Sequence, residues 1–154
     1  MYNHAPKNYN CPICKLIKGS NDELTIQEDI IYSDRNLTAF IAAKWWNNNP
    51  GHVIIIPNIH FENIYDITDE ILSKIFIFVK KVAIGLKKEY QCDGISISQH
   101  NEPSGSQDLW HFHVHVFPRY KGDRLYQLYD KCRWTKPEER ISYANKLREY
   151  FKTK

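Results

Sequence analysis

The segment from Trp110 to Pro118 constrains the fold of this 154-residue chain more than any other part of the sequence. Three histidines alternate there with three apolar residues: His111, His113 and His115 with Phe112, Val114 and Val116. A period of two residues is typical of a β-strand with one buried and one polar face. The segment therefore predicts a strand whose apolar side chains enter the core and whose imidazoles form a rigid row, spaced about 7 Å apart.

Rigid imidazoles act as general acids, nucleophiles or metal ligands. On a strand His111 and His115 would lie about 13 Å apart, too far to share one zinc ion at Zn–N distances of about 2.0–2.1 Å. We therefore expect the three histidines to have different roles. The alternative is a solvated polar strand face, which strict alternation close to Gln107 makes the weaker interpretation.

A neutral imidazole can attack phosphorus directly when a hydrogen bond to its other ring nitrogen fixes the tautomer. His113 holds the middle, best shielded position, so we expect it to be the nucleophile. Transfer of a phosphoryl or nucleotidyl group depends mainly on positioning and on donors around the non-bridging oxygens. The nearest candidate donors are His115, Asn101 and Gln107.

Cys11 and Cys14 form a Cys-x-x-Cys pair, which is half of a zinc site. A redox pair is the rival interpretation, but such a pair is expected at the start of a helix in a βαβ pattern. Here the pair lies in a polar N-terminal segment. Cys92 and Cys132 lack the spacing of metal ligands and are expected to be free thiols, as in a reducing compartment.

These motifs together resemble the signature of the histidine-triad (HIT) family. Other stretches match family positions in the same order: Cys11 to Ile17, Ala39 and Phe40, Pro50 to Pro57 and on to His60, Asn101 and Glu102, and Pro118 to Asp123. The resemblance covers most of the chain and implies an α+β, HIT-like fold. This fold would be a single domain over residues 1–154, with an antiparallel sheet of about five strands, one long helix, a C-terminal helix and a homodimer.

The resemblance implies a nucleotide hydrolase or nucleotidyl transferase that cleaves a phosphoanhydride or phosphoramidate at the α-phosphorus. The substrate would be a dinucleoside polyphosphate or a nucleoside phosphoramidate with a purine base. His113 would form a covalent nucleotidyl-histidine that water hydrolyses, His115 would contact the phosphate, and Gln107 would support the bridging or leaving oxygen. This chemistry requires no catalytic metal.

In bacterial-type members of the family, the two remaining zinc ligands match His60 and His111. A closed Cys2His2 shell has no open position, so the zinc would be structural and would attach the N-terminal segment to the catalytic strand. His52 is the alternative ligand, in which case His60 would be an ordinary surface residue.

Candidate nucleotide contacts are Ile13, Phe40, His52, Asn101 and Asp108; Ile13 and Phe40, like Leu16, match apolar base-pocket positions that could equally belong to the core. Ala42 departs from the family, because the usual Asp or Asn at this position binds both ribose hydroxyls. Amides of the following loop could replace that group, while Trp45 or Trp46 either stacks on a base or covers the pocket, or else closes the core or a dimer contact. Asp108 stands where Ser or Thr is common, and its carboxylate would repel a phosphate unless it pairs with a basic group or orients His113.

Periodicity and turn residues predict the order of elements. The expected strands are 30–32, 37–40, 53–57 and 94–99, besides the triad strand, and the expected helices are about 68–90 and 137–151. The loop from Asn101 to Gln107 has the composition of a phosphate cradle or of a plain hairpin loop. In the long helix Ile77, Phe78 and Ile84 fall outside the apolar stripe, which includes Phe76; a homodimer interface is the simplest explanation, and partial exposure is the alternative.

The formal net charge of +3 is spread along the chain, so the composition does not argue for a nucleic-acid partner. No apolar run approaches the roughly 20 residues of a membrane span, and the start lacks a secretory signal, so we expect no membrane association and a cytoplasmic protein. Arg119 and Lys121 are either polyphosphate contacts or ordinary loop charges.

Two other functions remain open: a binding protein without turnover, and a metal-dependent hydrolase with an open zinc at His113 and His115.

Overall fold

The computed structural model describes residues 2–21 and 24–153. Its helices are α1 (Pro12–Ile17), α2 (Asp69–Glu89) and α3 (Pro137–Lys152), with short 3-10 turns at Gln27–Asp29 and Pro103–Gly105. Its strands are β1 (Ile30–Ser33), β2 (Leu37–Ile41), β3 (Lys44–Trp46), β4 (Val53–Pro57), β5 (Gly94–Gln99), β6 (Val114–Arg119) and β7 (Cys132–Trp134). The predicted mixed fold, with a five-stranded antiparallel sheet, a long helix and a C-terminal helix, is confirmed. None of the helices in this part of the chain combines the length and apolar character needed to cross a bilayer.

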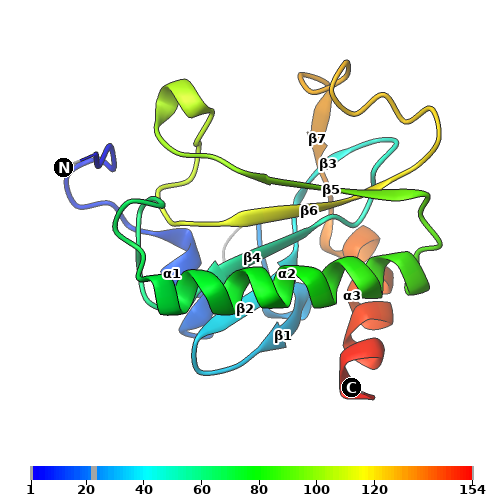
Figure 1. Ribbon diagram of the computed structural model, residues 1–154, viewed down its shortest axis with the longest axis horizontal. Helices are drawn as coiled ribbons and strands as arrows, with labels where there is room; N and C mark the ends of the chain where they lie inside the picture. Colours follow the sequence, from blue (N-terminus) through cyan, green and yellow to red (C-terminus); the bar gives the residue numbers. More distant parts are fainter. Residues whose placement is uncertain (1, 22–23, 154) are drawn as a thin grey trace.

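The main sheet has the order β1-β2-β4-β6-β5, so β6 lies between two antiparallel neighbours and β5 forms an edge. One face of the sheet is covered by α2, which packs against β4, β5 and β6, while α3 packs against β1, β2 and α2 (Figure 1). A separate two-stranded sheet joins β3 to β7. This small sheet brings residues from the C-terminal third of the chain close to the loop that follows β2.

The predicted apolar side of the triad segment is confirmed, because Phe112, Val114 and Val116 are fully buried. The prediction that all three histidines lie on one strand was wrong, since β6 begins at Val114. The neighbouring strand explains this limit: β4 ends at Pro57, which has no N–H to continue the ladder. Upstream of Val114 the chain is held by isolated contacts instead, such as the 2.6 Å bond from the Phe112 amide to the Phe61 carbonyl.

The long helix α2 begins at Asp69, close to the expected start, and the Thr68 side chain caps it by accepting from the Ile71 amide at 3.4 Å. The sequence-based prediction of buried and exposed positions on this helix was wrong for Phe76 and Phe78. Phe78, predicted to lie in a dimer interface, is buried and stacks on Tyr32 at a centroid distance of 4.4 Å, whereas Phe76 is 42% exposed. The reason is that α2 contacts α3 as well as the sheet, and Phe151 of α3 packs on Phe78.

Candidate active site and metal site

Four side chains from distant parts of the chain converge on one point: Cys11 and Cys14 at the start of α1, His60 after β4, and His111 before β6. Their candidate ligand atoms all lie within 4.8 Å of one another. The Sγ–Nδ1 distances are 3.5 Å for Cys11–His111, 3.3 Å for Cys14–His60 and 3.7 Å for Cys14–His111. Tetrahedral zinc with Zn–S near 2.3 Å and Zn–N near 2.0–2.1 Å places sulfur and nitrogen about 3.6 Å apart. The four residues, which we call the metal group, therefore fit a tetrahedral metal ion, and His52 is not among them.

The chemistry of this group also suits a metal. The Nε2 atom of His111 lies 2.9 Å from the Pro57 carbonyl, which only accepts, so Nε2 carries the hydrogen and the Nδ1 lone pair faces the sulfurs. Burial lowers the pKa of His111 to about 4, which keeps the ring neutral. Burial, followed by the neighbouring Cys11, raises the pKa of Cys14 to about 11. A bound cation would reverse this effect by stabilising both thiolates.

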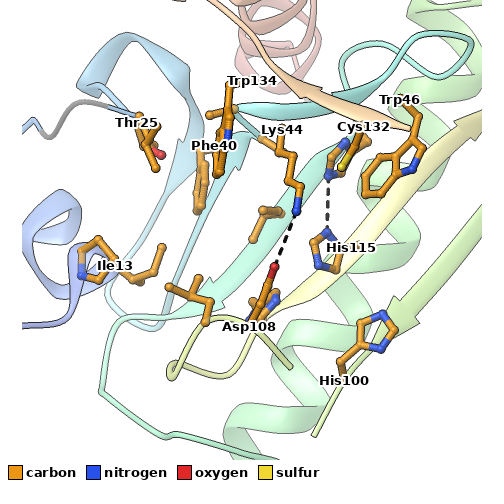
Figure 2. Close-up of a pocket in the computed structure, with 18 of the residues that line it drawn as sticks. Ile13, Thr25, Phe40, Lys44, Trp46, His100, Asp108, His115, Cys132 and Trp134 are labelled. Carbon is orange, nitrogen blue, oxygen red and sulfur yellow. Dashed lines mark hydrogen bonds and ion pairs between the residues drawn. The ribbon is translucent and has the colours of Figure 1, made fainter. Parts of the chain in front are cut away.

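A cavity of about 460 Å³ lies beside the metal group (Figure 2). One end is apolar and is lined by Ile13, Phe40 and Leu109, and Ile54 pairs in register with Phe40 on one side and His115 on the other. The other end is lined by the imidazoles of His52, His100, His113 and His115. The small sheet supplies a third wall with Lys44, Trp46, Cys132 and Trp134. The cavity therefore joins an apolar surface to a cluster of ring nitrogens.

His113 is 2% exposed, and its Nδ1 lies 2.8 Å from the carbonyl of His111. Because that carbonyl only accepts, Nδ1 carries the hydrogen and Nε2 keeps the lone pair. Burial lowers the pKa of His113 and lowers the pKa of His115 well below its ordinary value. Both rings are therefore neutral near pH 7, and their centroids lie 4.9 Å apart.

His52 contacts the ring of His115. The Nε2 atom of His52 lies 3.3 Å from Nδ1 of His115, and its ring stacks on Phe117 at 4.3 Å. Burial lowers the pKa of His52 to about 3. Within the described part of the chain, Nδ1 of His52 is buried without a hydrogen-bond partner. The predicted nucleotide contact at His52 therefore lies on the cavity wall and in contact with the triad.

Gln107 and Asn101 lie beside the cavity but do not line it. The Gln107 amide donates to the carbonyls of Glu62 at 2.7 Å and Leu109 at 3.0 Å, and its oxygen accepts from the Glu102 amide at 2.8 Å. The Asn101 oxygen accepts from the Ile64 amide at 2.8 Å. Both side chains thus hold the loop before the triad in place, and their predicted contacts with substrate stay predictions.

The structure separates the two tryptophans that sequence reasoning left undecided. Trp45 is in the core, with its indole N–H 2.6 Å from the Ala42 carbonyl, whereas Trp46 lines the cavity. Of the apolar base-pocket positions, Ile13 and Phe40 line the cavity and Leu16 packs in the core. Arg119 does not line it, because its guanidinium is bound to Asp123 at 2.7 Å and lies at the far end of β6.

Several cavity residues had no signal in the sequence: His100, Tyr129, Cys132 and Trp134. His100 precedes the loop outside the alternating pattern, and its Nδ1 lies 2.8 Å from the Gly105 carbonyl. The other three belong to β7 or precede it, and a three-residue strand has too little periodicity to be recognised. Asp108 does line the cavity, and it pairs with Lys44, a second lining residue that sequence reasoning missed.

This protein thus combines a small α+β fold with a cluster of histidines that lies beside a Cys2His2 group. The HIT domain family matches residues 23–122, and the chain belongs to this family. It is 34% identical over 115 residues to "Protein hit" of Bacillus subtilis, covering 74% of each chain. A zinc-bound histidine-triad family protein from Mycobacterium smegmatis has the same fold, with a TM-score of 0.75, 21% identity and 94% of each chain covered. Bis(5'-adenosyl)-triphosphatase of Saccharomyces cerevisiae is 28% identical over 110 residues, which are 68% of this chain and 52% of the relative.

The buried His52 predicts a pH dependence of stability. Its pKa is about 3 in the folded state and about 6.5 in an unfolded chain, so between these values only the unfolded state binds the proton. Stability should therefore fall as pH is lowered from about 6.5 towards 3, with His52 contributing up to about 1.4 kcal/mol per pH unit. In urea titrations, His52→Gln should reduce this slope. Cys92→Ala, a buried change without a titrating group in this range, should lower stability at every pH and keep the slope; an unchanged slope in His52→Gln would contradict the assignment.

Proposed function

We propose that the protein is a nucleotidyl-transferring hydrolase in which His113 attacks the α-phosphorus of a nucleotide. The observation that carries this proposal is the bond from Nδ1 of His113 to the His111 carbonyl, which leaves a neutral Nε2 lone pair on a residue that lines the cavity. The bond is made by backbone, so it holds the ring in one tautomer without a second side chain. Neutral imidazole is the nucleophilic form, and burial maintains it.

The chemistry proceeds in two displacements at phosphorus. The Nε2 lone pair forms a P–N bond while the bond from phosphorus to the leaving oxygen or nitrogen breaks, and the leaving group departs with its electron pair and takes up a proton. Water then attacks the same phosphorus, loses a proton and releases the neutral ring of His113. We assign the hydrogen of the 3.3 Å contact between His52 and His115 to Nε2 of His52, and this tautomer leaves the Nε2–H of His115 for a non-bridging phosphate oxygen.

The substrate we propose is a purine nucleotide carrying a phosphoanhydride or a phosphoramidate. A volume of about 460 Å³ lies within the usual range for small-molecule sites, and the apolar end suits a base. The yeast relative's designation, Bis(5'-adenosyl)-triphosphatase, makes a dinucleoside triphosphate one candidate. A second candidate function, nucleotide binding without turnover, is favoured by Gln107, whose polar atoms are bound to the loop rather than directed into the cavity.

We also propose that the metal group holds a structural zinc ion. All four ligands come from protein, so a tetrahedral ion would have no open position. Neither His113 nor His115 belongs to this group, which argues against a hydrolytic metal at the triad. When bound, zinc would attach the N-terminal segment to His111 and would stabilise the thiolates of Cys11 and Cys14.

A homodimer is part of the same proposal. Phe76, Ile77 and Ile84 on α2 are 42%, 61% and 41% exposed, and Ile97 on the edge strand β5 is 50% exposed. Since α2 packs beside β5, these apolar side chains and an open strand edge lie on neighbouring elements. Open edges and exposed apolar patches are usually covered.

His113→Ala should remove turnover by about 10⁴-fold or more while keeping the fold, because it deletes the attacking atom. Acid quenching of wild type with α-labelled diadenosine triphosphate or adenosine phosphoramidate should trap labelled protein, and the variant should trap none. His4→Ala, an exposed histidine outside the cavity, is the matched control. Wild-type activity in His113→Ala would refute the nucleophile, and nucleotide binding by wild type without label or turnover would favour the binding protein.

Cys11→Ala should lower stability chiefly by removing zinc, because metal binding is coupled to folding. The loss should be about 4 kcal/mol when free zinc is about a thousandfold above its dissociation constant. Thermal melts with and without chelator, together with metal content, measure this. Cys132→Ala, a cysteine outside the metal group, should keep both the zinc and the chelator sensitivity; equal behaviour of the two variants would contradict a structural zinc.

Ile84→Glu should convert a dimer of this 18.3 kDa chain to a monomer in sedimentation velocity, because a charge would be buried in the interface. Ile141→Glu, a 36% exposed position on α3, should leave the mass unchanged. A wild-type protein that sediments as a monomer at all concentrations would rule out the dimer.

A further inference from the structure

The apolar and imidazole ends of the cavity are separated by one ion pair. Lys44 on β3 and Asp108 in the loop before the triad reach toward each other, with Nζ and Oδ2 3.9 Å apart. Figure 2 shows their charged ends meeting between Phe40 and Ile13 on one side and His115 on the other. Among the described residues that line the cavity, Lys44 is the only lysine or arginine and Asp108 the only acid. The cavity therefore has a single matched pair of full charges, at its middle.

This pair is loose. Its distance is long for an ion pair with a hydrogen bond, and its side chains are 39% and 75% exposed. An exposed pair of this kind contributes little to stability, so little is lost when it opens. An ammonium has three donors and a carboxylate about four acceptor sites, so both groups retain hydrogen-bonding capacity towards a ligand.

The proposed function determines what must lie at this point. A nucleotide with its base against Ile13 and Phe40 and its α-phosphorus at His113 places its sugar between the two ends. The charged residues there are Lys44 and Asp108, and Ala42, which also lines the cavity, has no polar side chain to bind a sugar. Ribose hydroxyls are donors and a carboxylate only accepts, so Asp108 complements a sugar and not a phosphate.

We propose that Asp108 is the sugar-specificity residue of this site: it accepts hydrogen bonds from the 2'- and 3'-hydroxyls of a ribonucleotide while Lys44 turns to a non-bridging phosphate oxygen. The two charges separate when substrate enters, and each gains a partner of the correct type. Lys44 also offsets the repulsion between the Asp108 carboxylate and the phosphate. This inference rests on the proposed function, because it assumes a nucleotide in the cavity.

The test compares ribonucleotides with 2',3'-dideoxynucleotides of the same base and leaving group. Wild type should prefer the ribonucleotide by about tenfold to a hundredfold in kcat/KM, the usual range for lost hydrogen bonds to a charged group. Asp108→Ala should bring this ratio close to one, and Asp108→Asn should give an intermediate ratio because an amide oxygen still accepts. Lys44→Met should lower kcat/KM to a similar degree for both sugars. Because Asp108 is largely exposed, the variants should fold, and circular dichroism checks this.

A binding measurement separates this inference from the catalytic proposal. On a His113→Ala background, calorimetry with AMP and 2',3'-dideoxy-AMP should show the same preference, and adding Asp108→Ala should remove it. If no labelled wild-type protein were trapped, the covalent nucleotidyl-histidine would be disproved, but the calorimetric test of the sugar preference would still be valid. An Asp108→Ala variant that keeps the wild-type sugar ratio would overturn the inference. The inference would also fail if Asp108→Ala changed kcat/KM according to the charge of the leaving group and not according to the sugar.

Discussion

The site depends on His111, which makes contacts in two directions. Its ring faces Cys11 and Cys14 through Nδ1 and is fixed by the Pro57 carbonyl through Nε2, while its own carbonyl accepts from Nδ1 of His113. Any rotation of the His111 ring would disturb the metal group, and any shift of its peptide would disturb the tautomer of His113. The metal group and the proposed nucleophile, His113, are therefore coupled through one residue, whose ring faces the metal group and not the cavity.

The parts of this site that sequence reasoning could predict are those with a local pattern. Alternation over residues 111–116 identified the buried face, and the Cys-x-x-Cys spacing identified half of the metal group. The alternation could not reveal where β6 begins, because that limit is set by Pro57 on the neighbouring strand. The polar residues of the loop were also ambiguous: Gln107 and His100 are both near the triad in sequence, and only the folded loop shows that His100 lines the cavity.

Contacts between distant segments account for the other differences. Lys44 and Trp134 face each other only because β3 pairs with β7, and neither three-residue strand has a recognisable period. The exchange of Phe76 and Phe78 has a similar origin, since a helix packed on a sheet alone would bury one stripe, whereas α2 also contacts α3. Hydrophobic periodicity locates a helix well, but the width of its buried face depends on partners that lie elsewhere in the chain.

Burial has the same electrostatic effect on every triad imidazole and on His52, because it lowers the pKa of each ring and removes its positive charge. Neutral rings make a good nucleophile and good metal ligands, but they cannot balance the charge of a phosphate. A phosphate bound as proposed would therefore depend on hydrogen-bond donors and on Lys44, the one permanent cation among the described lining residues. In the proposed complex, the hydroxyls of the sugar would bind Asp108, and Lys44 would turn from this loose pair to the phosphate. A phosphate attached to a hydroxylated sugar would therefore contact both charged groups in the proposed complex, whereas a free phosphate would contact only Lys44.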